Sequence, residues 1–247
     1  DAALVSLIQK GDRVFPQDRA EIESLRERSL NLVEQMEKMM AGNGGRGAFP
    51  FTIPRRYQNL PRLLGRATVQ LEFESIPPVI VELDGYSSPL SCGTFLHQVI
   101  GGAFGGAEIA QAKNDFFIKV VPRPSSPHAR PPVEIRVDGD VSPIYGESLD
   151  HAGLADLQPA LPMTAYGSLA YSPLEGDFET GVSDDSSLFI FTLDPRSDAA
   201  RSRNLLNGQV SVFAYAREGK EGLQRLRAGD RIVRITVLEG LERFVDI

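Results

Sequence analysis

Apolar residues follow two different periods along the chain. Between Ile22 and Met40 they recur at spacings of three and four, with charged residues on the opposite face, which predicts one amphipathic helix. After Gly65 the period changes to two, and residues 67–73 alternate between apolar and polar types, as expected of a half-buried strand. The pattern therefore predicts a helical beginning followed by a domain built of strands.

The segment 79–95 predicts a strand, a tight turn and the beginning of a helix. Asp84 and Gly85 supply the turn, because glycine can take a positive φ without steric cost. Ser88 followed by Pro89 is typical of a helix N-cap and first helical position. We expect the later strands to assemble around this unit.

Short strands dominate the rest of the chain. They are expected at 116–121, 133–137, 166–171, 188–193, 210–215 and 232–238, with a short helix at 221–227. Many short strands with few helices predict a mainly β fold, namely a closed antiparallel β-barrel with flanking helices. The expected organisation is a short N-terminal α-helical segment at 1–47, a Pro-rich extended connector at 48–64 and the barrel domain at 65–247.

Composition excludes several classes of partner. The formal net charge is −7 and no stripe rich in Lys and Arg stands out, which argues against nucleic acid. No apolar run approaches the roughly 20 residues of a membrane-spanning helix, so no membrane-spanning segment is expected, and no signal segment is recognised at Asp1. Cys92 is the sole cysteine, which excludes an internal disulfide and a cysteine-based zinc site.

Neither a cofactor nor a metal is expected. Residues 42–47 match the spacing of the dinucleotide fingerprint, but a predicted helix precedes them and Phe49-Pro50 follows, so the strand and helix that the fingerprint needs are missing. The three histidines lie far apart in the sequence, at 97, 128 and 151, without the spacing of paired metal ligands.

Several sequence blocks together resemble the cyclophilin domain. They are VELDGYSSPLSCGTF, GSLAYS, SSLFIFT, LLNGQVSVFAYAREG and AGDRIVRITVLEG. More narrowly, FPFTIPRRYQNLPRLLGRATVQL, SPIYGESL and LPMTAYGSLAYS resemble the multidomain cyclophilin-like proteins of the chloroplast thylakoid lumen. This resemblance implies a cyclophilin-like barrel behind a helical segment, a lumenal location, and thylakoid membrane complexes as partners, above all a photosystem on its lumenal side.

The resemblance also implies where a catalytic groove would lie. Peptidyl-prolyl isomerisation crosses a barrier of about 18–20 kcal/mol set by amide resonance. Cyclophilins lower it with an arginine donor near the prolyl nitrogen, beside an apolar pocket. Gln111 falls at the arginine position and Phe116 at a pocket phenylalanine, while Lys119 replaces a glutamine.

The remaining groove positions are also altered. Leu188 stands for a second glutamine, Ile190 for a second pocket phenylalanine, Leu205 for a tryptophan and Val210 for a histidine, whereas Leu206 matches the family's leucine. No catalytic set is therefore intact, and Gln111 and Phe116 are the remaining candidates.

Two functions are compatible with this pattern. The first is a catalytically impaired cyclophilin-fold protein of the thylakoid lumen that binds photosystem proteins and supports their assembly, stability or maintenance. The alternative is an active but slow peptidyl-prolyl cis-trans isomerase acting on lumenal client proteins. A generic barrel module with no photosynthetic role requires the narrower resemblance to be coincidental.

Overall fold

The chain separates into two compact units, Asp1–Pro50 and Phe51–Ile247. The computed structural model describes residues 49, 52–113, 116–124, 129–139, 142–163, 165–173, 181–193 and 207–246, which lie almost wholly in the second unit. The helical segment expected at 1–47 lies outside the described residues.

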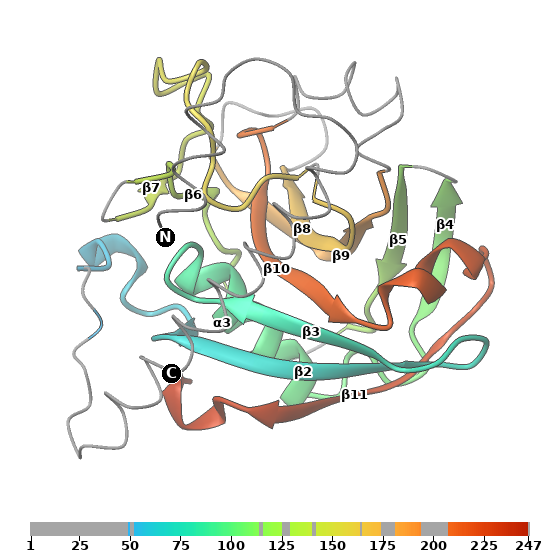
Figure 1. Cartoon of the computed structure of the whole chain (residues 1–247). Coiled ribbons are helices and arrows are strands. Elements are labelled where there is room, and N and C mark those ends of the chain that lie inside the picture. The colour runs from blue at the N-terminus through green and yellow to red at the C-terminus, as the bar shows by residue number, and fades with distance from the viewer. Residues whose placement is uncertain are drawn as a thin grey trace, which may run out of the picture. The chain divides into compact units, whose positions relative to one another are not determined.

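One antiparallel sheet forms the body of the second unit. Its strand order is β11-β2-β3-β10-β8-β9-β5-β4 (Figure 1). The strands are β2 Arg66–Phe73, β3 Val79–Asp84, β4 Glu108–Lys113, β5 Phe117–Val121, β8 Ser168–Pro173, β9 Ser183–Phe191, β10 Ser211–Glu218 and β11 Ile232–Glu239. Since strands far apart in the sequence are neighbours, the sheet brings segments from the whole unit together.

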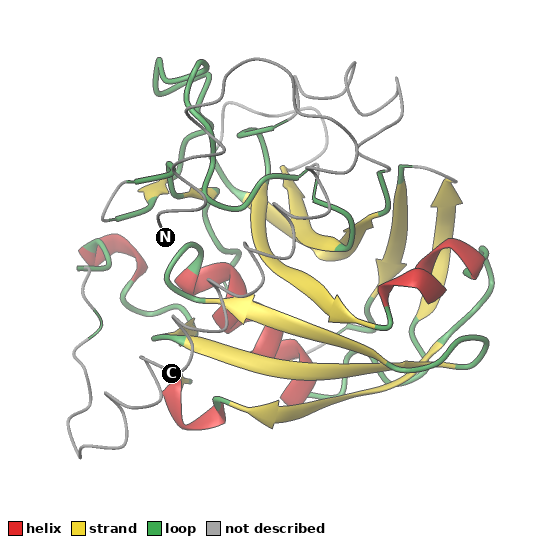
Figure 2. Ribbon diagram, in the orientation of Figure 1, coloured by secondary structure: helices red, strands yellow, loops and turns green. Residues whose placement is uncertain are grey.

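The remaining elements are short, apart from one helix (Figure 2). They are the helix α3 Pro89–Ile100, the 3-10 turns η1 Arg55–Tyr57, η3 Lys220–Arg225 and η4 Leu241–Arg243, the paired strands β1 Arg62–Leu63 and β12 Phe244–Val245, and the paired strands β6 Glu134–Ile135 and β7 Ile144–Tyr145. The mainly β prediction is confirmed. No helix among the described residues is long and apolar enough to cross a membrane.

The closed barrel is not confirmed. The edge strands β4 and β11 meet only at their beginnings, where Glu108 forms an isolated bridge with Arg231, the residue before β11. Next to it, the N–H of Ile109 donates to the carbonyl of Asp230 at 2.8 Å, and that of Ile232 to the carbonyl of Ala107 at 2.9 Å. Because the two strands are antiparallel and meet at their first residues, each then runs away from the other, and the sheet curls without a closing ladder.

The main core fills the inside of the curled sheet. Along β2 every second residue is buried, as the period of two predicts. The helix α3 presents Phe95 to this core, where its ring centroid lies 5.2 Å from that of Phe104 and 5.5 Å from that of Phe213. Cys92, one turn earlier, is also fully buried in this core.

The predicted strand–turn–helix unit is present, although its glycine acts differently from the expectation. Gly85 does not adopt a positive φ. Its N–H donates to the carbonyl of Gly65 at 2.9 Å, and a Cβ would clash with the carbonyl oxygens of Leu63 and Gly65. Glycine is therefore needed at this turn because another backbone segment passes so close.

Residues 52–64 of the Pro-rich connector pack into the same unit as the sheet. Leu60 and Leu63 are buried, and β1 within the connector pairs with β12 near the end of the chain. In α3, Gly93 leaves the room that β1 occupies, because a Cβ there would clash with the backbone of Pro61 and Arg62. Residues 52–64 are thus an integral part of this unit.

Candidate functional site

The strands β5 and β9 present different residues to the two faces of the sheet. Ile118 and Val120 of β5 belong to the main core, and their cross-strand partners in β9 are Ile190 and Leu188. Phe117 of β5 and Phe191 of β9 face the opposite side of the sheet. There they belong to a second apolar cluster, whose buried members are Phe117, Met163, Ala170, Phe191, Leu193 and Val212. This outer face carries the candidate site.

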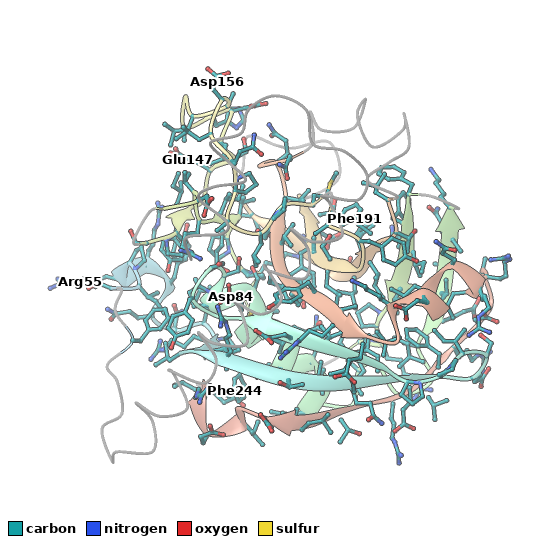
Figure 3. All side chains as sticks on the ribbon, viewed as in Figure 1. Arg55, Asp84, Glu147, Asp156, Phe191 and Phe244 are labelled. Carbon is teal, nitrogen blue, oxygen red and sulfur yellow. The ribbon has the colours of Figure 1, made fainter. Side chains whose placement is uncertain are left out.

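Aromatic rings dominate that outer cluster. The ring centroid of Phe117 lies 4.9 Å from that of Phe116 and 5.3 Å from that of Phe189, both in edge-on arrangements. Phe191 stacks on Phe189 at 6.4 Å, and Figure 3 labels it on β9, between β8 and β5 in the sheet. We call Phe116, Phe117, Met163, Phe189 and Phe191 the aromatic face. Phe116 and Phe189 are half-buried, so part of each ring is accessible.

The structure does not bring Leu188 and Ile190 to this face. Their side chains are 0% and 1% exposed and lie in the main core. Phe189 and Phe191 occupy the outer positions of β9 instead, so these aromatic residues lie on this face where Leu188 and Ile190 were expected. A shift of one residue along a strand exchanges its two faces, which accounts for the difference.

Gln111 and Lys119, by contrast, do lie together. They are cross-strand partners in the β4–β5 hairpin, and Lys119 is in turn the partner of Phe189 in β9. Phe116 lies immediately before β5 and packs against the same cluster. Val210 is partly buried against it as well, whereas Leu205 and Leu206 lie outside the described residues.

Two lysines border the aromatic face. Lys119 Nζ lies 5.5 Å from the ring centroid of Phe189, and Lys113 Nζ lies 5.1 Å from that of Phe117. Both distances suit a cation–π contact. The face therefore combines accessible aromatic surface with two positive charges, and Gln111 is an uncharged hydrogen-bonding group beside them.

The described residues contain no group of three metal-ligating side chains. Asp184 and Asp185 each approach Arg130 at 3.8 Å, and the Asp185 carbonyl also accepts a hydrogen bond from Gln98. Their carboxylates are engaged within the fold. A cavity of about 190 Å³ is lined by Ala112, Lys113, Ile118, Thr192, Leu223, Gln224 and Leu226. Its lining places no carboxylate, histidine or cysteine beside the hydroxyl group of Thr192.

One buried carboxyl group lies at the beginning of α3. Glu134 accepts hydrogen bonds from the N–H of Leu90 at 3.0 Å and from the N–H and hydroxyl of Ser91 at 2.6 and 2.7 Å. Burial raises the pKa of Glu134 to about 7, although these hydrogen bonds act in the opposite direction. The carboxyl group satisfies the free N–H groups of the helix, so its role here is structural.

Comparison with curated proteins finds three relatives that cover most of this chain. A protein named as a thylakoid lumen peptidyl-prolyl cis-trans isomerase of Synechocystis sp. is 34% identical over 95% of this chain and 62% of its own length. The chloroplastic peptidyl-prolyl cis-trans isomerases CYP38 and CYP37 of Arabidopsis thaliana are 30% and 29% identical, over 80% and 87% of this chain and 48% and 47% of their own lengths. The chain thus spans about half to three-fifths of the relatives it matches.

Other comparisons add less. No family profile matches the chain. A solved cyclophilin-type peptidyl-prolyl cis-trans isomerase from Cryptosporidium parvum covers 70% of this chain and 98% of its own, with 16% identity and a TM-score of 0.49.

Proposed function

This chain belongs to the cyclophilin family, and from that premise we propose that it is a catalytically impaired cyclophilin that binds photosystem proteins on the lumenal side of the thylakoid membrane. The expected resemblance to thylakoid-lumen cyclophilins is confirmed by these relatives, as is the thylakoid-lumen location. Binding would support the assembly, stability or maintenance of the partner.

The proposed catalytic impairment rests on Gln111, the cross-strand partner of Lys119. The resemblance assigns the arginine of active cyclophilins to this position in β4, and Gln111 occupies it. Glutamine can donate a hydrogen bond but has no positive charge to stabilise the twisted amide in the transition state. Removing one donor from a comparable electrostatic role lowers the rate by about 10²–10³-fold.

The binding half rests on the aromatic face. Its edge-on and stacked rings form an apolar surface, and Phe116 and Phe189 leave part of that surface accessible. Half-accessible aromatic rings contribute strongly to recognition because they bury a large apolar area with little loss of conformational entropy. A prolyl ring, which is compact and apolar, suits such a surface. The chain thus keeps a binding surface without the charged catalytic donor.

The alternative, an active but slow isomerase, is favoured by one observation. The ammonium group of Lys119 lies over the ring of Phe189, across the hairpin from Gln111, and could provide positive charge from the neighbouring strand. In that case Lys119→Gln would abolish the acceleration of prolyl isomerisation. In the impaired protein the same substitution would leave the already uncatalysed rate unchanged.

Partner binding is tested with inside-out thylakoid vesicles, whose lumenal surface faces the solution. The chain of 247 residues should sediment with them saturably, and Phe189→Ser should lose most of that binding because the aromatic face is disrupted. Removing residues 1–50 should preserve it. A deletion that extends to residue 64 is unsuitable, because it removes buried Leu60 and Leu63 together with β1.

The control variant in this assay is Leu241→Ser, which changes an apolar side chain that is 48% exposed and lies outside the aromatic face. If the Phe189→Ser and wild-type proteins bind the vesicles equally, the aromatic face is excluded as the partner surface. Binding lost on removal of residues 1–50 would assign it to the N-terminal unit instead.

A further inference from the structure

We propose that the aromatic face selects acidic segments, in which a side-chain carboxylate lies close to the bound proline. This inference rests on the proposed function and specifies the chemical class of the partner. It follows from the placement, surroundings and charge of two lysines.

The register of the sheet fixes both lysines beside the rings. Lys113 is the cross-strand partner of Phe117, and Lys119 is the partner of Phe189 on one side and of Gln111 on the other. Since cross-strand partners share a face of the sheet, the two lysines and the aromatic rings form one continuous surface. An extended peptide that contacts the rings therefore passes within reach of an ammonium group.

Neither ammonium group is neutralised within the described part of the chain. The ion pairs there involve arginines and His97, and no carboxylate pairs with Lys113 or Lys119. Each ammonium instead lies over an aromatic ring. A ligand carboxylate would supply the missing counter-charge and a charge-assisted hydrogen bond, which is about twice as strong as a neutral one.

The rest of the chain makes this positive charge distinctive. The formal net charge is −7, so a partner acidic enough to bind here is repelled by most of the protein and attracted by this face. The third lysine of the described residues, Lys220, lies in η3 and not on the aromatic face. Local charge of this kind governs which partner binds and how strongly that binding depends on salt concentration.

The test measures binding of fluorescent peptides to the chain of 247 residues by anisotropy. Three extended peptides differ only in the residue before proline, which is Glu, Gln or Lys. We expect the Glu-Pro peptide to bind about tenfold more tightly than the Gln-Pro peptide at low salt, and the Lys-Pro peptide to bind most weakly. The preference should shrink at about 0.5 M salt, because the screening length falls to a few ångströms.

Variants assign the preference to the two lysines. Lys113→Gln and Lys119→Gln should each reduce it, the double substitution should abolish it, and Lys119→Glu should favour the Lys-Pro peptide. Lys220→Gln is the matched control and should leave all three affinities unchanged. Circular dichroism checks that each variant is folded.

Two results would overturn the inference and distinguish it from the proposed function. Equal affinities for the three peptides, or a preference that survives the double substitution, would refute acidic selection and leave the proposed function standing. Failure of the folded protein to bind any proline peptide would refute both. Lysine-dependent binding to anionic lipid vesicles, with peptide binding independent of the lysines, would assign the charge to a membrane surface and also refute the inference.

Discussion

Two adjacent residues of β9 have opposite roles. Ile190 is 1% exposed in the main core, whereas Phe189 is half-buried on the outer side beside Lys119. Replacement of a buried isoleucine removes apolar burial and leaves a cavity. Replacement of a half-buried ring mainly removes surface that a ligand can contact.

This difference predicts separable effects of two substitutions. Ile190→Ala should lower the free energy of unfolding by about 2–5 kcal/mol. Phe189→Ala should cost clearly less stability, yet it should weaken proline-peptide binding severalfold. Urea denaturation and peptide anisotropy on the same preparations measure both quantities. An equally destabilised Phe189→Ala protein with unchanged peptide affinity would reverse the assignment of the two faces.

At the scale of single elements, α3 begins where the sequence predicts but is capped by a residue that the sequence does not reveal. Ser88 is the N-cap and Pro89 the first helical residue, as expected. The Ser88 hydroxyl nevertheless donates to the carbonyl of Val212 at 2.9 Å, and the Glu134 carboxyl group accepts from the helix N–H groups. Local rules identify a helix start, whereas a cap from a distant strand depends on the tertiary fold.

The buried cap makes stability depend on pH. Because the pKa of Glu134 rises from 4.5 to about 7 on folding, the folded protein binds the proton more tightly than the unfolded chain. This contribution to stability is therefore complete below about pH 4.5 and is lost as the pH rises through 7. Its size is on the order of 3 kcal/mol.

Glu134→Gln should flatten that dependence, since glutamine does not titrate. Urea denaturation at pH 5 and pH 8 should show a smaller difference in unfolding free energy for Glu134→Gln than for the wild type. The Glu134→Gln protein should also be less stable at pH 5, because the NH2 group of glutamine cannot accept a hydrogen bond, whereas both oxygens of a protonated carboxyl group can. Glu147→Gln, a change at an exposed position, is the control. The same pH dependence in the wild-type and Glu134→Gln proteins would contradict the role of this carboxyl group.

Across the whole molecule, the sequence predicts which segments are strands or helices better than it predicts which strands pair and which face each strand presents. The period of two identifies β2 and β3, and the resemblance brings Gln111 and Lys119 to one site because a single hairpin holds them. The face presented by β9 and the open edge between β4 and β11 were missed. Both depend on pairing between distant strands, which alternation within one strand does not encode. The sequence signal available for β9 was its alternating Leu-Phe-Ile-Phe pattern, which leaves both faces apolar.

Comparison of the wild-type protein with Gln111→Arg in a prolyl isomerisation assay tests the central claim most directly. The uncatalysed reaction takes tens to hundreds of seconds at 25 °C, so modest acceleration is measurable. We expect the wild-type protein to leave the rate nearly unchanged, and Gln111→Arg to accelerate it in proportion to protein concentration, with about 10²–10³-fold higher activity. Gln111→Lys, which adds charge without the planar guanidinium, should restore less. Strong catalysis by the wild-type protein would contradict the claim that Gln111 leaves the enzyme impaired, whether or not Gln111→Ala diminishes it.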